Sequence, residues 1–273
     1  MRQVVHPGPV AEERLDLLPA DGQPVEVEIA ACVPLEDAVA EALAPLGFHS
    51  AYLELQAAPT AQLRYVIPGE APDNTHVAWY SEELGFEAGE IVHIGMIVGR
   101  HGAASFIHGH GTWRAKGGPL RMGHILAPKT VLEEAVTARG IGLWGAGFER
   151  LPDAETNFDL FQVRGAGEAG GRYAALRVKP NEEFGAALTA ARARLGWERA
   201  RAHGIGSLIG ARFDGGHELG STPSEFLLTG TEVGGPMRLI IVGTDGDDIL
   251  EGTLVAGANP VLITAEIVLE RLT

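Results

Sequence analysis

Apolar and polar residues alternate over many short stretches of the chain, and this pattern predicts β-strands. Residues 25–30 alternate in this way. The apolar residues that follow recur at helical spacing, which predicts a helix over 35–46 that ends at Gly47. In the rest of the first half, the pattern predicts strands over 50–56, 62–67, 90–98 and 103–113.

The second half of the chain repeats this order of elements. A strand is predicted over 173–178, and a helix begins with a capping-type sequence at Asn181 and runs to Leu195 and Gly196. Further strands are predicted over 207–213, 225–230, 238–242 and 261–269. Because the order of strand, helix and hairpin occurs twice, we expect an internal duplication.

A stretch rich in glycine and alanine separates the two halves. Residues 165–171 hold no bulky apolar side chain that could pack, so we interpret them as a linker. The predicted organisation is an N-terminal extension over 1–23, a first domain over 24–164 and a second domain over 172–273.

Each half also contains a predicted hairpin. His110 and His124 are fourteen residues apart and flank a turn-forming segment centred near Gly117. Leu239 and Thr253 have the same separation and flank a second such segment. Both return strands carry a glycine immediately before the matched position.

Composition narrows the class of protein. The 273 residues include 21 Lys and Arg against 36 Asp and Glu, a net charge of −15. This charge disfavours sequence-independent binding to nucleic acid, which depends on clustered cations. Cys32 is the single cysteine, so no disulfide framework is expected. The sequence has neither a long apolar run nor a signal-peptide pattern, so we expect a cytoplasmic protein that does not enter a membrane.

Histidines are concentrated in one part of the first half. Five of the ten fall between His93 and His124. His108 and His110 are two residues apart on a predicted strand, so both side chains lie on the same face. A hairpin that turns about Gly117 places His124 directly opposite His110. Three converging imidazoles are the ligand set of a catalytic zinc site with one open position.

Other interpretations of these histidines stay open. Nickel, iron or manganese are alternatives to zinc, and the imidazoles could instead form local hydrogen bonds without any metal. The corresponding positions of the second half are Met237, Leu239 and Thr253, so we expect that copy to lack a metal.

Groups that could assist a metal are less well defined by the sequence. His93 precedes the His108–His110 strand and could support a metal ligand. Glu90, Glu133 and Glu134 are weak candidates for a base that acts on metal-bound water, because most carboxylates of this kind are solvated surface groups. Residues 69–88 form a predicted long loop, which could be a lid, an interface element or a disordered surface segment.

The order of motifs resembles the plants-and-prokaryotes conserved domain family (PCC, also written PPC). The first half carries His108-Gly-His110 and Gly123-His124-Ile-Leu at the family spacing. The second half carries Glu225-Phe-Leu-Leu-Thr-Gly-Thr, an Asp-Gly turn at 245–246 and a Thr-Ala-Glu strand that ends at Glu266. The resemblance covers most of 24–162 and 172–272.

This resemblance implies an α+β fold: two duplicated domains, each a mainly antiparallel sheet with one main helix. It also implies assembly of several copies, so we expect a homo-oligomer. The family shares its fold with acetolactate decarboxylase, whose HxH…H zinc triad corresponds here to His108, His110 and His124. The AT-hook of the DNA-binding plant members has no counterpart in this sequence.

Three functions are therefore compatible with the sequence. The first is a metal-dependent hydrolase or decarboxylase that acts on a small carbonyl or carboxylate compound. The second is a DNA-binding or transcription-associated protein, which the net charge disfavours. The third is a non-catalytic module for ligand binding or assembly. We expect a small molecule as the ligand and do not expect nucleic acid as a partner.

Overall fold

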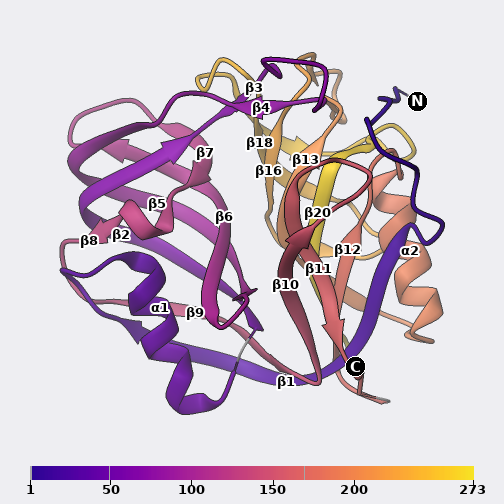
Figure 1. Cartoon of the computed structure of the whole chain (residues 1–273), viewed down its shortest axis with the longest axis horizontal. Helices are drawn as coiled ribbons and strands as arrows, with labels where there is room; N and C mark the ends of the chain where they lie inside the picture. The colour runs from indigo at the N-terminus through magenta and orange to yellow at the C-terminus, as the bar shows by residue number, and fades with distance from the viewer. Residues whose placement is uncertain (1, 49, 169) are drawn as a thin grey trace.

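A computed structural model describes residues 2–48, 50–168 and 170–273 (Figure 1). The first half contains β1 (Leu15–Ile29), α1 (Leu35–Leu43), η1 (Ala44–Leu46), β2 (Ser50–Val66), β3 (Pro68–Gly69), β4 (Trp79–Tyr80), β5 (Leu84–His101), β6 (Ala104–Ala115), β7 (Arg121–Ile125), η2 (Ala127–Lys129), β8 (Val131–Leu132), β9 (Val136–Trp144), β10 (Ala146–Pro152) and β11 (Asp159–Gly165). The second half contains β12 (Tyr173–Val178), α2 (Phe184–Arg194), β13 (Ala200–Leu208), β14 (Ala211–Arg212), β15 (Glu218–Leu219), β16 (Glu225–Leu228), β17 (Thr231–Glu232), β18 (Arg238–Val242), β19 (Ile249–Thr253) and β20 (Val261–Arg271).

Sixteen of the described strands join into one mixed sheet, while β3 with β4 and β14 with β15 form two separate two-stranded sheets. Its order is β11-β10-β5-β6-β7-β2-β9-β1-β12-β20-β13-β16-β18-β19, with β8 and β17 beside this path. Strand β1 connects the two halves, because residues 15–20 pair with β12 and residues 21–29 pair with β9. The strand therefore crosses the domain boundary expected at residue 24.

The expectation of an α+β fold with one main helix in each domain is wrong. The described residues are mostly strand, and α1 and α2, with 9 and 11 residues, are the α-helices among them. Strands β2 and β5 alone have 17 and 18 residues, so each helix only covers part of a much larger sheet. The internal duplication stays a prediction.

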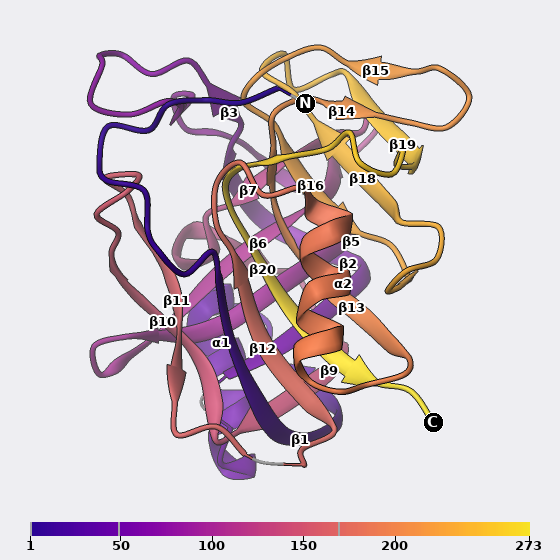
Figure 2. The same cartoon turned by 90° about the vertical axis from the view of Figure 1, so that its right-hand side faces the viewer.

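The two halves of the sheet pack against each other (Figures 1 and 2). Helix α1 and one face of the first-half strands enclose a core that includes Leu35 and Met96. Helix α2 and second-half strands enclose another, which includes Phe184 and Ile267. A third core joins the halves, and it contains Tyr52, Ile97, Ile205, Leu227 and Val268. The inner face of the first half is thus buried against the second half.

Gly95 on β5 allows the two halves to approach closely. A Cβ atom at this position would lie 2.4 Å from Leu227 Cδ1 and 2.8 Å from the Tyr52 hydroxyl. Because Gly95 pairs with His110 across β5 and β6, this contact lies beside the histidine strand.

Two local expectations differ from the structure. The loop expected over 69–88 is shorter, because β3 and β4 pair within this region and β5 already begins at Leu84. In the second hairpin, Thr253 pairs with Arg238 rather than with Leu239. No helix in the described ranges is long and apolar enough to cross a membrane.

Candidate metal centre

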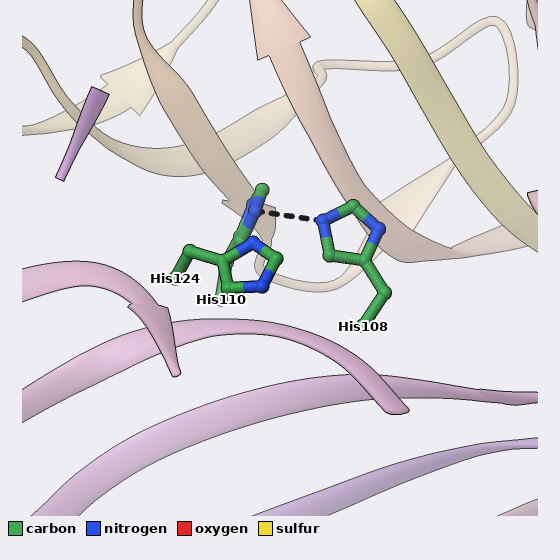
Figure 3. Close-up of side chains that lie close together, drawn as sticks. All are labelled: His108, His110 and His124. Atoms are coloured by element: carbon green, nitrogen blue, oxygen red, sulfur yellow. Dashed lines mark hydrogen bonds between the residues drawn. The ribbon is translucent and has the colours of Figure 1, made fainter. Parts of the chain in front are cut away.

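Strands β6 and β7 bring His108, His110 and His124 together (Figure 3). His110 pairs directly with His124, which confirms the register expected for a turn about Gly117. His108 lies two residues before His110 and therefore projects from the same face. One nitrogen atom from each ring lies within 4.8 Å of the other two.

The second half of the chain orients two of these rings. His108 Nδ1 contacts Glu266 Oε2 of β20, and His110 Nδ1 lies 3.0 Å from the Phe226 carbonyl oxygen of β16. The opposite nitrogens, His108 Nε2 and His110 Nε2, then lie 3.1 Å apart. This pattern, in which one ring nitrogen is held by a carboxylate or carbonyl and the other is left for a metal, is common for histidine ligands.

The spacing of the ring nitrogens fits a small divalent ion. With zinc–nitrogen distances near 2.0–2.1 Å, two ligands of a tetrahedral site are about 3.3 Å apart. The 3.1 Å between His108 Nε2 and His110 Nε2 is close to that value. His124 Nδ1 is buried and has no hydrogen-bond partner in the described part of the chain. The three histidines therefore form a group that fits a metal ion.

Burial keeps two of the imidazoles in the form that binds metals. Desolvation, followed by the charge of His108, lowers the pKa of both His110 and His124 well below the usual value. A neutral imidazole has a free lone pair on one nitrogen, so low pKa values favour metal coordination near neutral pH.

A buried carboxyl group, Glu225 of β16, lies beside the histidines. Its Oε1 atom is 3.7 Å from His110 Nε2, and the residue is 5% exposed. Its Oε2 atom has no hydrogen-bond partner among the described residues. Desolvation raises the pKa of Glu225 well above the usual value for a carboxyl group, so the protonated form is favoured.

A narrow pocket of about 50 Å³ opens beside this group of side chains. His108, His110 and Glu225 lie at one part of its wall, and Tyr80 of β4 lies at another. The Tyr80 ring contacts His124 edge-on, with 5.3 Å between ring centroids. Burial raises the pKa of Tyr80, and the charges of Glu225 and Glu266 add to this effect. The segment that the sequence marked as a possible lid thus contributes a wall of the pocket.

The other sequence candidates lie away from the lining of this pocket. Glu90 accepts a hydrogen bond of 2.6 Å from Arg114 Nε, and Glu133 and Glu134 are exposed. His93 Nε2 lies 3.5 Å from Glu54 Oε2, and Glu54 also accepts a hydrogen bond from the Tyr52 hydroxyl.

Sequence reasoning did not assign Glu225 or Glu266 to the site. Both residues lie within segments that carry the family resemblance, and this was the one feature of the sequence that could have pointed to them. Their contacts with His110 and His108 join positions more than 100 residues apart, so no local pattern could reveal them.

Comparison with known proteins gives several similar structures. Metal-containing protein AF0104 from Archaeoglobus fulgidus is 20% identical over 52% of this chain and 94% of its own, with a TM-score of 0.39. A plant- and prokaryote-conserved (PPC) protein from Pyrococcus horikoshii is 15% identical over 56% of this chain and 96% of its own, with a TM-score of 0.39. A putative DNA-binding protein from Ralstonia eutropha JMP134 is 12% identical over 55% and 90%, with a TM-score of 0.38.

No protein-family model matches the chain, and no curated protein does so. A PPC protein is among the solved structures to which this chain is similar. The likeness to acetolactate decarboxylase stays a prediction.

Proposed function

We propose that this protein is a metal-dependent enzyme that hydrolyses or decarboxylates a small carbonyl compound. The observation that carries the proposal is the convergence of three imidazoles beside a pocket. The buried residue Glu225 also lines this pocket and supplies a carboxyl group. Such a combination of ligands, an adjacent acid–base group and a small cavity is typical of a metal-dependent active site.

Zinc is the metal that we favour. Three neutral imidazoles suit zinc and leave a fourth position for water or substrate. When bound, zinc polarises a carbonyl oxygen or lowers the pKa of a water molecule. The chain itself would hold the ligands in place through the contacts of His108 with Glu266 and of His110 with Phe226.

Glu225 is the group that we assign to proton transfer. Its protonated form can donate a hydrogen bond to an oxygen atom of a substrate, and its ionised form can accept a proton. Its position 3.7 Å from His110 Nε2 places it beside the metal ligands. The residue is buried and lines the pocket, so its carboxyl group would lie next to a substrate held at the histidines.

Metal analysis of the purified protein tests the proposal. We expect about one zinc per chain in the wild type, and loss of most of it in His110→Ala and His124→Ala. The control is His101→Ala, because His101 is exposed and outside the group of three. Metal that remains after both site substitutions would contradict the assignment.

Turnover is then measured on short esters and β-keto acids. The zinc-loaded wild type and His101→Ala should be active, whereas chelated protein and His110→Ala should not. Glu225→Gln should retain zinc and lose activity by roughly 100-fold or more, as for the loss of a positioned acid–base group. Full activity of Glu225→Gln would remove this residue from the mechanism.

A further inference from the structure

The walls of the pocket beside the histidines are mainly apolar. It is surrounded by side chains from β4, from β11, from β20 and from the segment that precedes β16. The apolar ones include Trp79, Phe158, Leu160, Pro223, Leu262 and Ile263. The part of a ligand that does not reach the histidines would therefore contact hydrocarbon and aromatic surface.

The serine and threonine hydroxyl groups on these walls are already engaged within the protein. Ser224 Oγ donates to the Leu208 carbonyl oxygen at 2.8 Å and accepts from its amide. Ser207 Oγ accepts from the Ile263 amide at 2.9 Å, and Thr264 Oγ1 donates to Glu266. A ligand gains little from hydrogen bonds to these groups. By contrast, the buried Glu225 Oε2 lacks a partner within the described residues, and Glu225 lines the pocket.

The pocket offers no cation to a negatively charged substituent. Neither Lys nor Arg is among its lining residues in the described part of the chain. Arg150 affects the pKa of His124, but its guanidinium lies over the Phe106 ring at 4.7 Å and 3.7 Å from Asp159. A carboxylate carried into the pocket away from the histidines would lose its hydration without a compensating ion pair.

The size of the pocket limits the ligand further. At 10–15 Å³ for each water-sized site, a volume of about 50 Å³ corresponds to roughly four such sites. This space suits a short chain better than a ring.

We propose that the metal site accepts a small carbonyl compound whose remaining part is an uncharged aliphatic group of about three or four carbon atoms. This inference rests on the proposed function and specifies its substrate class. The polar head would meet the histidines and Glu225, and the aliphatic group would lie against Trp79, Leu160 and Ile263.

Binding of two hydroxamates of equal chain length to the zinc-loaded protein tests the inference. Butanohydroxamate ends in a methyl group, and succinic monohydroxamate carries a carboxylate in its place. Calorimetry should show that the wild type binds butanohydroxamate about tenfold more tightly, because the carboxylate has no partner in the pocket. Zinc content is measured on the same samples.

Leu160→Lys should abolish this preference. Leu160 lies in β11 and is half-buried in the pocket wall, so a cation there should improve succinic monohydroxamate binding until the two affinities are similar. Leu46→Lys makes the same change of charge at an exposed leucine outside the pocket and should keep the wild-type ratio. If Leu160→Lys does not fold, Trp79→Ala should weaken butanohydroxamate severalfold and leave acetohydroxamate unchanged.

The outcomes separate this inference from the proposed function. A zinc-loaded wild type that binds succinic monohydroxamate equally well or better overturns the inference and leaves the metal site intact. A protein that takes up no zinc contradicts the proposed function. In that case, butanamide and succinamate probe the same pocket without a metal: a preference for butanamide supports the inference, and equal binding overturns it.

Discussion

Glu266 Oε2 on β20 contacts Nδ1 of His108 on β6, although the two residues are 158 positions apart. The carboxylate is fully buried and comes from the second half of the chain, which supplies no histidine to the group of three. Strand β20 therefore fixes the orientation of a ring on β6, and the first-half site depends on the packing of the second half.

Glu266→Gln should weaken zinc binding by about 10–100-fold, the usual effect of losing the carboxylate that orients a histidine ligand. The amide keeps the shape of the side chain but loses its charge. Competition with a chelator of known affinity measures the change. Glu133→Gln is the matched control, because Glu133 is exposed, and its zinc affinity should equal that of the wild type. Equal affinities for all three proteins would show that Glu266 does not support the ligand.

Gly95→Ala should lower the free energy of unfolding by about 1–3 kcal/mol, since the new Cβ would lie 2.4 Å from Leu227 Cδ1. Urea denaturation measures this change. Gly220→Ala is the control, because a Cβ at Gly220 would have no heavy atom within 4 Å. Leu227→Ala is itself destabilising because Leu227 is fully buried, but Gly95→Ala should cost less in that background than in the wild type. A purely additive double variant would contradict the proposed clash.

The histidine hairpin could be predicted from the sequence because its register depends on residues that are close together in the chain. The glycines near 117 and the alternation along the strands define the register, and His110 pairs with His124 as expected. Helix α1 begins at Leu35 as predicted, and the segment ends at Gly47, whose φ of 73° suits glycine. The second hairpin differs by one residue, because the alternation of its strands does not specify how many residues its turn contains.

Features that depend on distant contacts could not be predicted in this way. Strand β1 pairs with β12 and β9, and nothing within 15–29 indicates a strand shared by two halves. The positions of Glu225 and Glu266 depend on how the second half packs over the first. The α+β prediction failed for the same reason. The long strands β2 and β5 form a sheet surface that is too large for two short helices to cover, and much of it is buried against the second half instead.

Acid should destabilise the protein partly through Asp153. Burial alone would raise the pKa of this carboxyl group, but Arg177, 2.8 Å away, and hydrogen bonds from Thr156 lower it below 3.8. Its ionised form therefore stabilises the fold above the unfolded-state pKa near 4, and this contribution is lost as the pH falls through the lower folded-state value. Urea denaturation between pH 6 and 2.5 measures it.

Asp153→Asn should be less stable than the wild type at pH 6 by about 3–5 kcal/mol, because it leaves the buried Arg177 without this partner. The difference should shrink as the pH falls below 4. Asp73→Asn, at an exposed position, should cost far less at pH 6. A deficit for Asp153→Asn that stays constant down to pH 2.5 would contradict the role of this carboxylate.

Removal of zinc should lower the melting temperature. An ion that binds only the folded chain stabilises it by about 4 kcal/mol when free zinc is 1,000 times the dissociation constant, which corresponds to a shift of roughly 10 °C. Calorimetric scans with zinc and with a chelator measure the shift. His101→Ala should show all of it and His110→Ala almost none, because only His110 belongs to the group of three. Since burial lowers the pKa of His110 and His124, protons should compete only weakly with zinc for these two imidazoles. A zinc-dependent shift of the same size in His110→Ala would place the ion elsewhere in the molecule.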